Sequence, residues 1–133
     1  MFHRNSTNAA FKYFLLCLLE IHLCLSGILI CFVQSVLHDW DHDACVKILK
    51  NCRKAIPPRE AGGKVIIINM VIGAGPSDLK HKEMQAMFDV YIMLVSGMER
   101  YEQEWSKIFS EAGFGGYRVI PVLGVRSIIE VYP

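Results

Sequence analysis

One histidine stands at the position of this chain that is best suited to chemistry. His38 follows an apolar run at residues 28–33 (ILICFV) and precedes an amphipathic stretch that begins at Asp41. A histidine where a buried strand gives way to a helix lies at the carboxyl edge of a sheet, the edge at which open α/β folds bind their ligands. The alternative is a structural side chain that packs beside Trp40. The spacing alone leaves both interpretations open.

The elements that follow would have to hold His38 in place. Asp41 is suited to be a helix N-cap, and Pro57 ends the helix that it would start. Apolar residues recur at helical spacing between these two points and indicate one buried face: Ala44, Cys45, Ile48, Leu49 and Cys52. Residues 65–68 are a continuous β-branched run, as expected of a strand that is covered on both faces.

A second helix is expected after the glycine-rich turn at residues 73–75. Ser77 is suited to cap it, and Ser96 with Gly97 would end it. Its apolar residues fall at helical spacing and are expected to face inward: Met84, Met87, Phe88, Tyr91, Ile92 and Val95.

A third helix and a hairpin complete the predicted order. The helix is expected over residues 102–112, with Gly113 as its C-terminal stop. Residues 117–122 and 125–132 flank a Leu-Gly pair, which predicts a terminal β-hairpin. The order of strand, helix, strand, helix, helix and hairpin predicts an α/β fold. It corresponds to the second half of a doubly wound sheet that is partly parallel and ends in an antiparallel hairpin.

Six blocks of sequence carry a resemblance to a known family: VLHDW, KILKNCRKAIP, GGKVIII, MERYEQEW, SEAGF and VLGVRSIIEVYP. In this order and spacing they resemble the C-terminal half of plant S-adenosylmethionine-dependent O-methyltransferases, which act on caffeate, flavonoid, isoflavone and stilbene phenols. The resemblance covers residues 36–133, interpreted as a partial catalytic domain. It implies a class I methyltransferase, Rossmann-like sheet in which the last strand inserts antiparallel beside the strand at 65–68.

The resemblance also implies a general base and two acids. His38 matches the family's base, which removes the proton of the phenol. Glu99, in the GMER segment, matches an acid that orients the base. Asn69 stands where the family has its second acid. An amide accepts a hydrogen bond but carries no charge, so we expect weaker stabilisation of the imidazolium.

Substrate and cofactor residues are implied in the same way. Met93 is the candidate that would contact the flat phenol ring, together with Asp39 and Trp40. S-adenosylmethionine is the family's cofactor, and Gln34 stands where the family has a lysine that contacts it. The family's glycine-rich loop does not occur here, and residues 73–75 (GAG) lead into a proline. We therefore expect weak cofactor binding and little turnover from these residues alone.

The segment before the resemblance, residues 1–35, is mostly apolar from residue 11 onward. A transmembrane helix fits residues 13–33 by length. A signal peptide fits the basic residues that precede the apolar block, although no small-residue cleavage site is clear. A buried apolar helix at 9–25, followed by a strand at 28–33, fits as well. The three interpretations stay open at this point.

The abrupt start of the resemblance at Val36 suggests an origin for the segment before it. Phe-Val-Gln at residues 32–34 can be encoded by a pyrimidine-rich run that ends in CAG, which is the form of an intron's acceptor end. Our hypothesis is that residues 1–34 derive from translated intron or a misassigned first exon. Transcript reads that run continuously across codon 34 would contradict it.

The composition narrows the partners. A formal net charge of +1 and a pI near 7.7 give no nucleic-acid footprint. The five cysteines include no CxxC pair, so we expect no metal and reduced thiols in the cytoplasm. An apolar edge strand at 28–33 would invite homo- or hetero-association. The rivals to an enzyme are therefore an inactive product that associates with a full-length relative, and a protein anchored in a membrane through residues 11–36.

Overall fold

The described part of the chain is built on one sheet. The computed structural model describes residues 24–25 and 28–133. Most of the apolar N-terminal segment, including nearly all of the helix expected at 9–25, lies outside the described residues. That prediction is wrong at its last two residues, because Cys24–Leu25 forms the short strand β1. Among the described residues no helix is both long and apolar enough to span a membrane.

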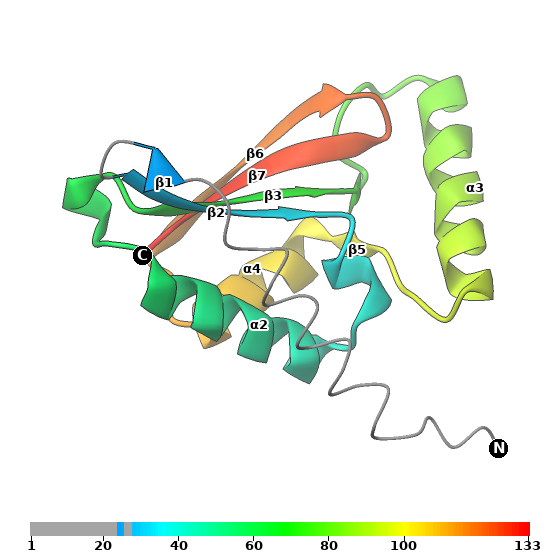
Figure 1. Ribbon diagram of the computed structural model, residues 1–133. Coiled ribbons are helices and arrows are strands. Elements are labelled where there is room, and N and C mark those ends of the chain that lie inside the picture. The colour runs from blue at the N-terminus through cyan, green and yellow to red at the C-terminus, as the bar shows by residue number, and fades with distance from the viewer. Residues whose placement is uncertain (1–23, 26–27) are drawn as a thin grey trace, which may run out of the picture.

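Among the described residues, five strands form a mixed sheet in the order β1–β2–β3–β7–β6 (Figure 1). Strands β2 and β3 are parallel, whereas β7 inserts antiparallel beside β3 and pairs antiparallel with β6. The last four strands of this order span Ile28–Gln34, Lys64–Asn69, Arg126–Tyr132 and Gly116–Leu123. The partly parallel sheet, the antiparallel insertion and the terminal hairpin confirm the predicted fold class.

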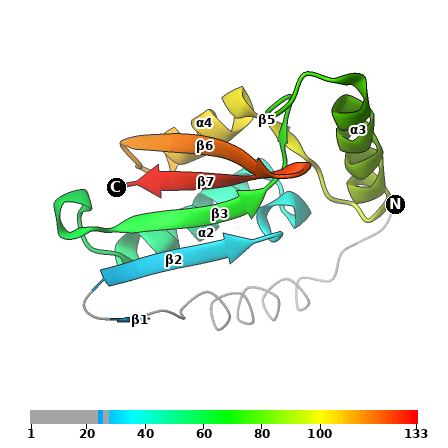
Figure 2. The same cartoon turned by 90° about the horizontal axis from the view of Figure 1, so that it is seen from above.

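Two helices, α2 (His42–Ala55) and α4 (Glu102–Glu111), cover one face of this sheet (Figures 1 and 2). Successive side chains of a strand point to opposite faces, so β3 directs Val65 and Ile67 into the layer beneath it. Both side chains are fully buried, as is Trp105 of α4. Burying a side chain of this size contributes about 1.5–3 kcal/mol, so this single layer carries most of the apolar stabilisation.

Helix α2 begins and ends where its sequence predicts. The Asp41 side chain accepts a hydrogen bond from the Ala44 N–H at 2.8 Å, which confirms the N-cap. The helix ends at Ala55, before Pro57. All five apolar residues of its predicted inner face are buried. The helix is therefore fixed at its start by a cap and along its length by the core.

Helix α3 (Leu79–Leu94) departs from its predictions. Asp78 caps it by accepting from the His81 N–H at 3.0 Å, so the prediction for Ser77 is wrong. Of the six residues predicted to face inward, Ile92 is buried, Phe88 is half-buried and the other four are exposed. The physical reason is placement: α3 stands beyond the end of the sheet rather than against its face (Figures 1 and 2). The described residues supply no cover for that apolar stripe.

Short elements join the two layers. They are the turns η1 (Leu37–Asp39) and η2 (Arg59–Ala61) and the paired strands β4 (Val71–Ile72) and β5 (Arg100–Tyr101). Strand β1 pairs only with the first two residues of β2. In the described part of the chain, the outer side of β2 beyond Leu29 therefore carries no strand, and Phe32 is exposed there.

Glu130 of β7 lies on the open face of the sheet, and its ionic contacts there can be tested for their contribution to stability. Its carboxylate accepts from the Tyr132 hydroxyl at 2.6 Å, from Lys64 Nζ at 3.2 Å and from Arg118 Nη2 at 2.8 Å, and these contacts lower its pKa from 4.5 to about 2. A carboxyl whose pKa is lowered by folding contributes stability above its unfolded pKa and loses it as the pH falls. We expect Glu130→Gln to lower the free energy of unfolding by about 1–2 kcal/mol at about pH 7.

The difference in the free energy of unfolding between the native chain and Glu130→Gln should shrink as the pH falls from about 4.5 toward 2. Over this range Glu130 becomes protonated, and it then carries no more charge than the glutamine does. Denaturant unfolding at several pH values measures it. Glu60→Gln, at an exposed position in η2, is the control and should stay within about 0.5 kcal/mol of the native chain. A Glu130→Gln deficit that is constant from neutral to acid pH would show that these contacts do not stabilise the charge.

Candidate active site

The candidate site lies where β2 ends. Ser35 adopts a positive φ of 52° immediately after the strand, and its N–H donates to the Ile68 carbonyl of β3 at 3.0 Å. The chain then enters η1, whose central residue is His38. The His38 side chain is 10% exposed, so it is close to the surface but mostly enclosed. The structure therefore places His38 at the carboxyl edge of the parallel pair, as the sequence predicts.

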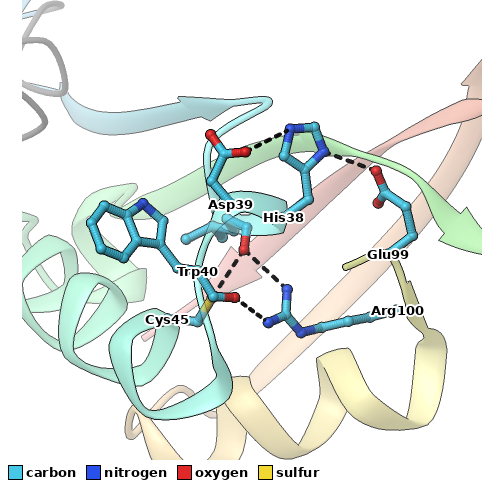
Figure 3. A network of polar contacts seen from close by, with 7 residues as sticks. His38, Asp39, Trp40, Cys45, Glu99 and Arg100 are labelled. Carbon is cyan, nitrogen blue, oxygen red and sulfur yellow. Dashed lines mark hydrogen bonds and ion pairs between the residues drawn. The ribbon is translucent and has the colours of Figure 1, made fainter. Parts of the chain in front are cut away.

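Glu99 meets His38 from the segment that leads into β5 (Figure 3). The Nδ1 atom of His38 lies 2.8 Å from Oε1 of Glu99, and the carboxylate side chain has no exposed surface. An ionised carboxylate only accepts hydrogen bonds, so this contact is a hydrogen bond when Nδ1 carries a hydrogen. In the neutral imidazole that tautomer leaves the lone pair on Nε2. The other nearby acid, Asp39, approaches Nε2 only to 3.9 Å, which is beyond hydrogen-bond distance.

Gly97 and Met98 bring Glu99 to the histidine. The Met98 N–H donates to the His38 carbonyl at 2.8 Å. A side chain at position 97 would place its Cβ atom 2.6 Å from that carbonyl oxygen and 2.7 Å from the Ile92 side chain. Glycine is therefore required at this approach, because no Cβ atom fits between helix α3 and the turn. The two segments, about 60 residues apart in sequence, form one unit.

Arg100 and Cys45 are polar residues of the site for which the sequence predicted no site role. The Arg100 guanidinium donates to the carbonyls of Leu37 and Trp40, at 3.0 and 2.6 Å (Figure 3). The Cys45 thiol donates to the Leu37 carbonyl at 3.2 Å, and burial raises its pKa to about 11. A signal for Arg100 was present, since it follows the predicted acid directly, but a charged residue is usually solvent-exposed.

Asn69 is not joined to His38. It ends β3 on the covered face of the sheet and is 1% exposed. Both polar atoms of its side chain are buried without a hydrogen-bond partner in the described structure. The structure thus brings together His38 and Glu99 of the three predicted catalytic residues. The role of Asn69 stays a prediction.

The predicted substrate residues are divided between two places. Asp39 and Trp40 follow His38 directly, in and after η1. Met93 lies on α3 and is 54% exposed, four residues before the glycine that touches the His38 carbonyl. Gln34 ends β2 with an exposed side chain and pairs with Ile68. No group of three or more metal-ligating side chains occurs among the described residues.

The glycine-rich turn after β4 does not fit a nucleoside cofactor. The Gly73 N–H already donates to Oε1 of Gln85 at 3.0 Å, and Nε2 of Gln85 donates to the Ala74 carbonyl at 3.1 Å. Gln85 is 4% exposed and fills the position in which a ligand would meet these backbone groups. The turn therefore anchors helix α3. The described residues hold a histidine–carboxylate pair, and this turn offers no cradle for an adenosyl group.

Fold and site together define a class I methyltransferase architecture. It carries a histidine–carboxylate pair at the carboxyl edge of its parallel strands. The chain belongs to the O-methyltransferase domain family, whose profile matches residues 28–115. The match starts at the first residue of β2, and the domain boundary at residue 36 stays a prediction.

Curated relatives agree with this assignment. Over 101 residues the chain is 85% identical to O-methyltransferase ZRP4 of Zea mays. The matched residues make up 76% of this chain and 28% of the maize protein. Over 102 residues it is 54% identical to trans-resveratrol di-O-methyltransferase of Vitis vinifera, covering 76% and 29%. The chain thus spans less than a third of the length of these relatives.

A solved structure supports the same fold. The methyltransferase CalO1 of calicheamicin biosynthesis, in a form with bound S-adenosylhomocysteine (SAH), superposes with a TM-score of 0.62 at 31% identity. The superposition covers 78% of this chain and 29% of CalO1. Both relatives are O-methyltransferases by name, and CalO1 is a methyltransferase whose solved form holds SAH.

The tautomer of His38 tests the geometry of the site. In the native chain we expect hydrogen on Nδ1 and none on Nε2, because Glu99 Oε1 accepts from Nδ1 at 2.8 Å. Glu99→Gln places an amide there, which can donate to Nδ1 and thereby favour hydrogen on Nε2. Long-range ¹H–¹⁵N spectra of the imidazole measure the two tautomers.

Glu111→Gln is the matched control for this measurement. Glu111 Oε2 lies 2.7 Å from Nε2 of His42 at the surface, so its substitution should change the His42 signals and leave those of His38 unchanged. If His38 keeps its hydrogen on Nδ1 in Glu99→Gln, the amide oxygen or another group accepts it, and the charge of Glu99 is not what selects the tautomer.

Proposed function

We propose that His38 is the general base of a methyl transfer to a phenolic hydroxyl and that Glu99 orients it. The observation that carries the proposal is the buried contact between Nδ1 of His38 and Oε1 of Glu99 at 2.8 Å. A carboxylate in this place fixes the tautomer of the ring and stabilises the imidazolium that forms when the ring takes a proton. The free Nε2 atom is then the acceptor.

The chemistry suits this arrangement. A free phenol has a pKa near 10, like tyrosine, so at neutral pH its oxygen is mostly protonated and a weak nucleophile. Nε2 of His38 would accept the phenol proton as the oxygen attacks, while Glu99 holds the opposite nitrogen. A positioned base of this kind contributes about 10²- to 10⁴-fold to the rate.

The substrate class is proposed from the relatives. Besides the resveratrol enzyme, the chain is 56% identical over 101 residues to 5-pentadecatrienyl resorcinol O-methyltransferase of Sorghum bicolor. Resveratrol and resorcinols are both phenols. We propose Asp39, Trp40 and Met93 as the residues that would contact the ring of such a substrate. S-adenosylmethionine is the proposed methyl donor, and when bound it supplies an electrophilic methyl group.

The proposed location is the cytoplasm. Cys45 is buried, and its thiol donates to the Leu37 carbonyl. Buried reduced thiols suit a reducing compartment. Alkaline carbonate extraction of cells that express the tagged chain tests this, because an inserted N-terminal segment would leave the chain in the membrane pellet.

Association with a relative is a second candidate function. It is supported by the apolar stripe on α3, where Met87 and Leu94 are more than 70% exposed, and by the outer side of β2 that carries no strand beyond Leu29 in the described residues. Exposed apolar surface of this kind marks interaction sites. Co-expression with a tagged full-length relative, followed by size-exclusion chromatography, tests it.

A chimaera tests the role of His38 directly. The segment of the maize enzyme that matches this chain is replaced by the corresponding residues of this chain, and methyl transfer to a panel of phenols is measured. We expect His38→Gln to lower kcat/KM by about 10²- to 10⁴-fold, because the base is lost. The control is His42→Gln, a histidine four residues further along whose ring faces Glu111 at the surface.

Two results of this assay would decide against the proposal. Activity of His38→Gln within about threefold of the unsubstituted chimaera would show that no proton is transferred to this ring. An equal loss in His42→Gln would show that the effect is on folding. A chimaera that is inactive with every phenol, yet folds and binds S-adenosylmethionine, would contradict the substrate class.

A further inference from the structure

Arg100 is a buried cation at the edge of the site. Its side chain is 1% exposed, although arginine is almost never fully buried without a partner. Among the salt bridges of the described residues none involves Arg100. Its neighbours are instead two backbone carbonyls, the thiol of Cys45 and the ring of Trp105, whose centroid lies 5.5 Å from the guanidinium carbon.

The cost of burying this charge requires a specific compensation. Burying a charge without a partner is costly, and hydrogen bonds from a charged donor, which are stronger than neutral ones, offset part of that cost. The planar guanidinium directs two N–H groups forward in a fixed fork. Nη1 reaches the Leu37 carbonyl at 3.0 Å and Nη2 reaches the Trp40 carbonyl at 2.6 Å. The two acceptors must therefore stay at a set separation for the charge to remain buried.

The two carbonyls flank the base. Leu37 precedes His38 by one residue and Trp40 follows it by two, so the fork of Arg100 spans the turn that carries the imidazole (Figure 3). Trp40 N–H also donates to the Leu37 carbonyl at 3.3 Å, which closes the turn from within. Arg100 closes the same turn from outside.

Three successive residues thus hold one histidine at three places. Met98 N–H binds the His38 carbonyl, the Glu99 carboxylate binds the His38 ring, and the Arg100 guanidinium binds the turn on both sides of it. The strand β5, which begins at Arg100, pairs with β4 in a separate two-stranded sheet, and β4 follows β3 closely in the chain.

We propose that Arg100 is a positioning residue for His38: by bridging the Leu37 and Trp40 carbonyls it sets the position from which the imidazole meets Glu99. The inference rests on the proposed role of His38 as the base. It adds that the GMER segment contributes two functional side chains, the acid that orients the ring and the cation that fixes the turn. Arg100 itself does not contact the reacting atoms.

The test uses the Nδ1 hydrogen of His38 in the full chain. Lysine keeps the positive charge but presents it at one point and cannot span two carbonyls as a fork. We expect Arg100→Lys to raise the exchange rate of the Nδ1 hydrogen with solvent about tenfold, the effect of weakening one charged hydrogen bond in the turn. NMR measurement of imidazole hydrogen exchange on folded protein gives the rate.

Arg59→Lys is the matched control. Arg59 lies 4.5 Å from the Tyr132 ring centroid on an exposed turn, and its conversion to lysine should leave the His38 exchange rate within about twofold. A folded Arg100→Lys chain whose His38 signals match those of the native chain would overturn the proposal, because the arginine would then be a packing residue only.

A measurement on the native chain covers the case in which Arg100→Lys fails to fold. A fork fixed on two carbonyls should show resolved, slowly exchanging Nη hydrogens, whereas averaged and rapidly exchanging ones would contradict the proposal. The outcome of the Arg100→Lys exchange experiment can be told apart from the outcome for the proposed function of His38. If the native His38 hydrogen is protected and Arg100→Lys releases it, the positioning stands even where His38→Gln leaves methyl transfer unchanged.

Discussion

A carboxylate with no exposed surface must be compensated, and in this chain the hydrogen-bond partner of Glu99 is the ring of His38. One oxygen of Glu99 meets Nδ1 at 2.8 Å, and the other is buried without a hydrogen bond in the described structure. Loss of the histidine would therefore leave a buried carboxylate unpaired, at a cost of several kcal/mol. The pair is at once a condition for stability and an arrangement suited to proton transfer, so the elements around it have little freedom to move.

The sheet supplies the fixed frame for that pair. Strand β2 leads to His38 at its carboxyl end and is held to β3 through Ser35, while the segment between helix α3 and β5 carries Glu99. The close approach at Gly97 lets the two segments meet, because the His38 carbonyl occupies the space that a Cβ atom would need. A parallel strand pair, the glycine and the hydrogen bonds of buried Arg100 to the turn thus surround the pair.

The sequence predicted those parts of this arrangement that have a local cause. Helix α2 followed from the Asp41 cap and its apolar spacing, and the His38–Glu99 pair followed from two motifs of a resembling family. Helix α3 shows the limit of prediction from local sequence. An apolar stripe indicates a buried face but does not say what covers it, and in the described residues most of that face is exposed to solvent. Arg100 was missed for a related reason: charge predicts exposure, and only the fold shows two carbonyls converging on the guanidinium.

The cost of burying a group without a hydrogen bond also bears on Asn69. The family's second acid would stand at this position, yet both polar atoms of the amide are buried without a hydrogen bond in the described structure. An unpaired buried amide costs about 1–3 kcal/mol, whereas an unpaired carboxylate costs more and would also repel Glu99 wherever the two charges are close. The amide is therefore the less costly group where no donor reaches. If His38 is the base, the stabilisation of its imidazolium then falls to the single carboxylate of Glu99.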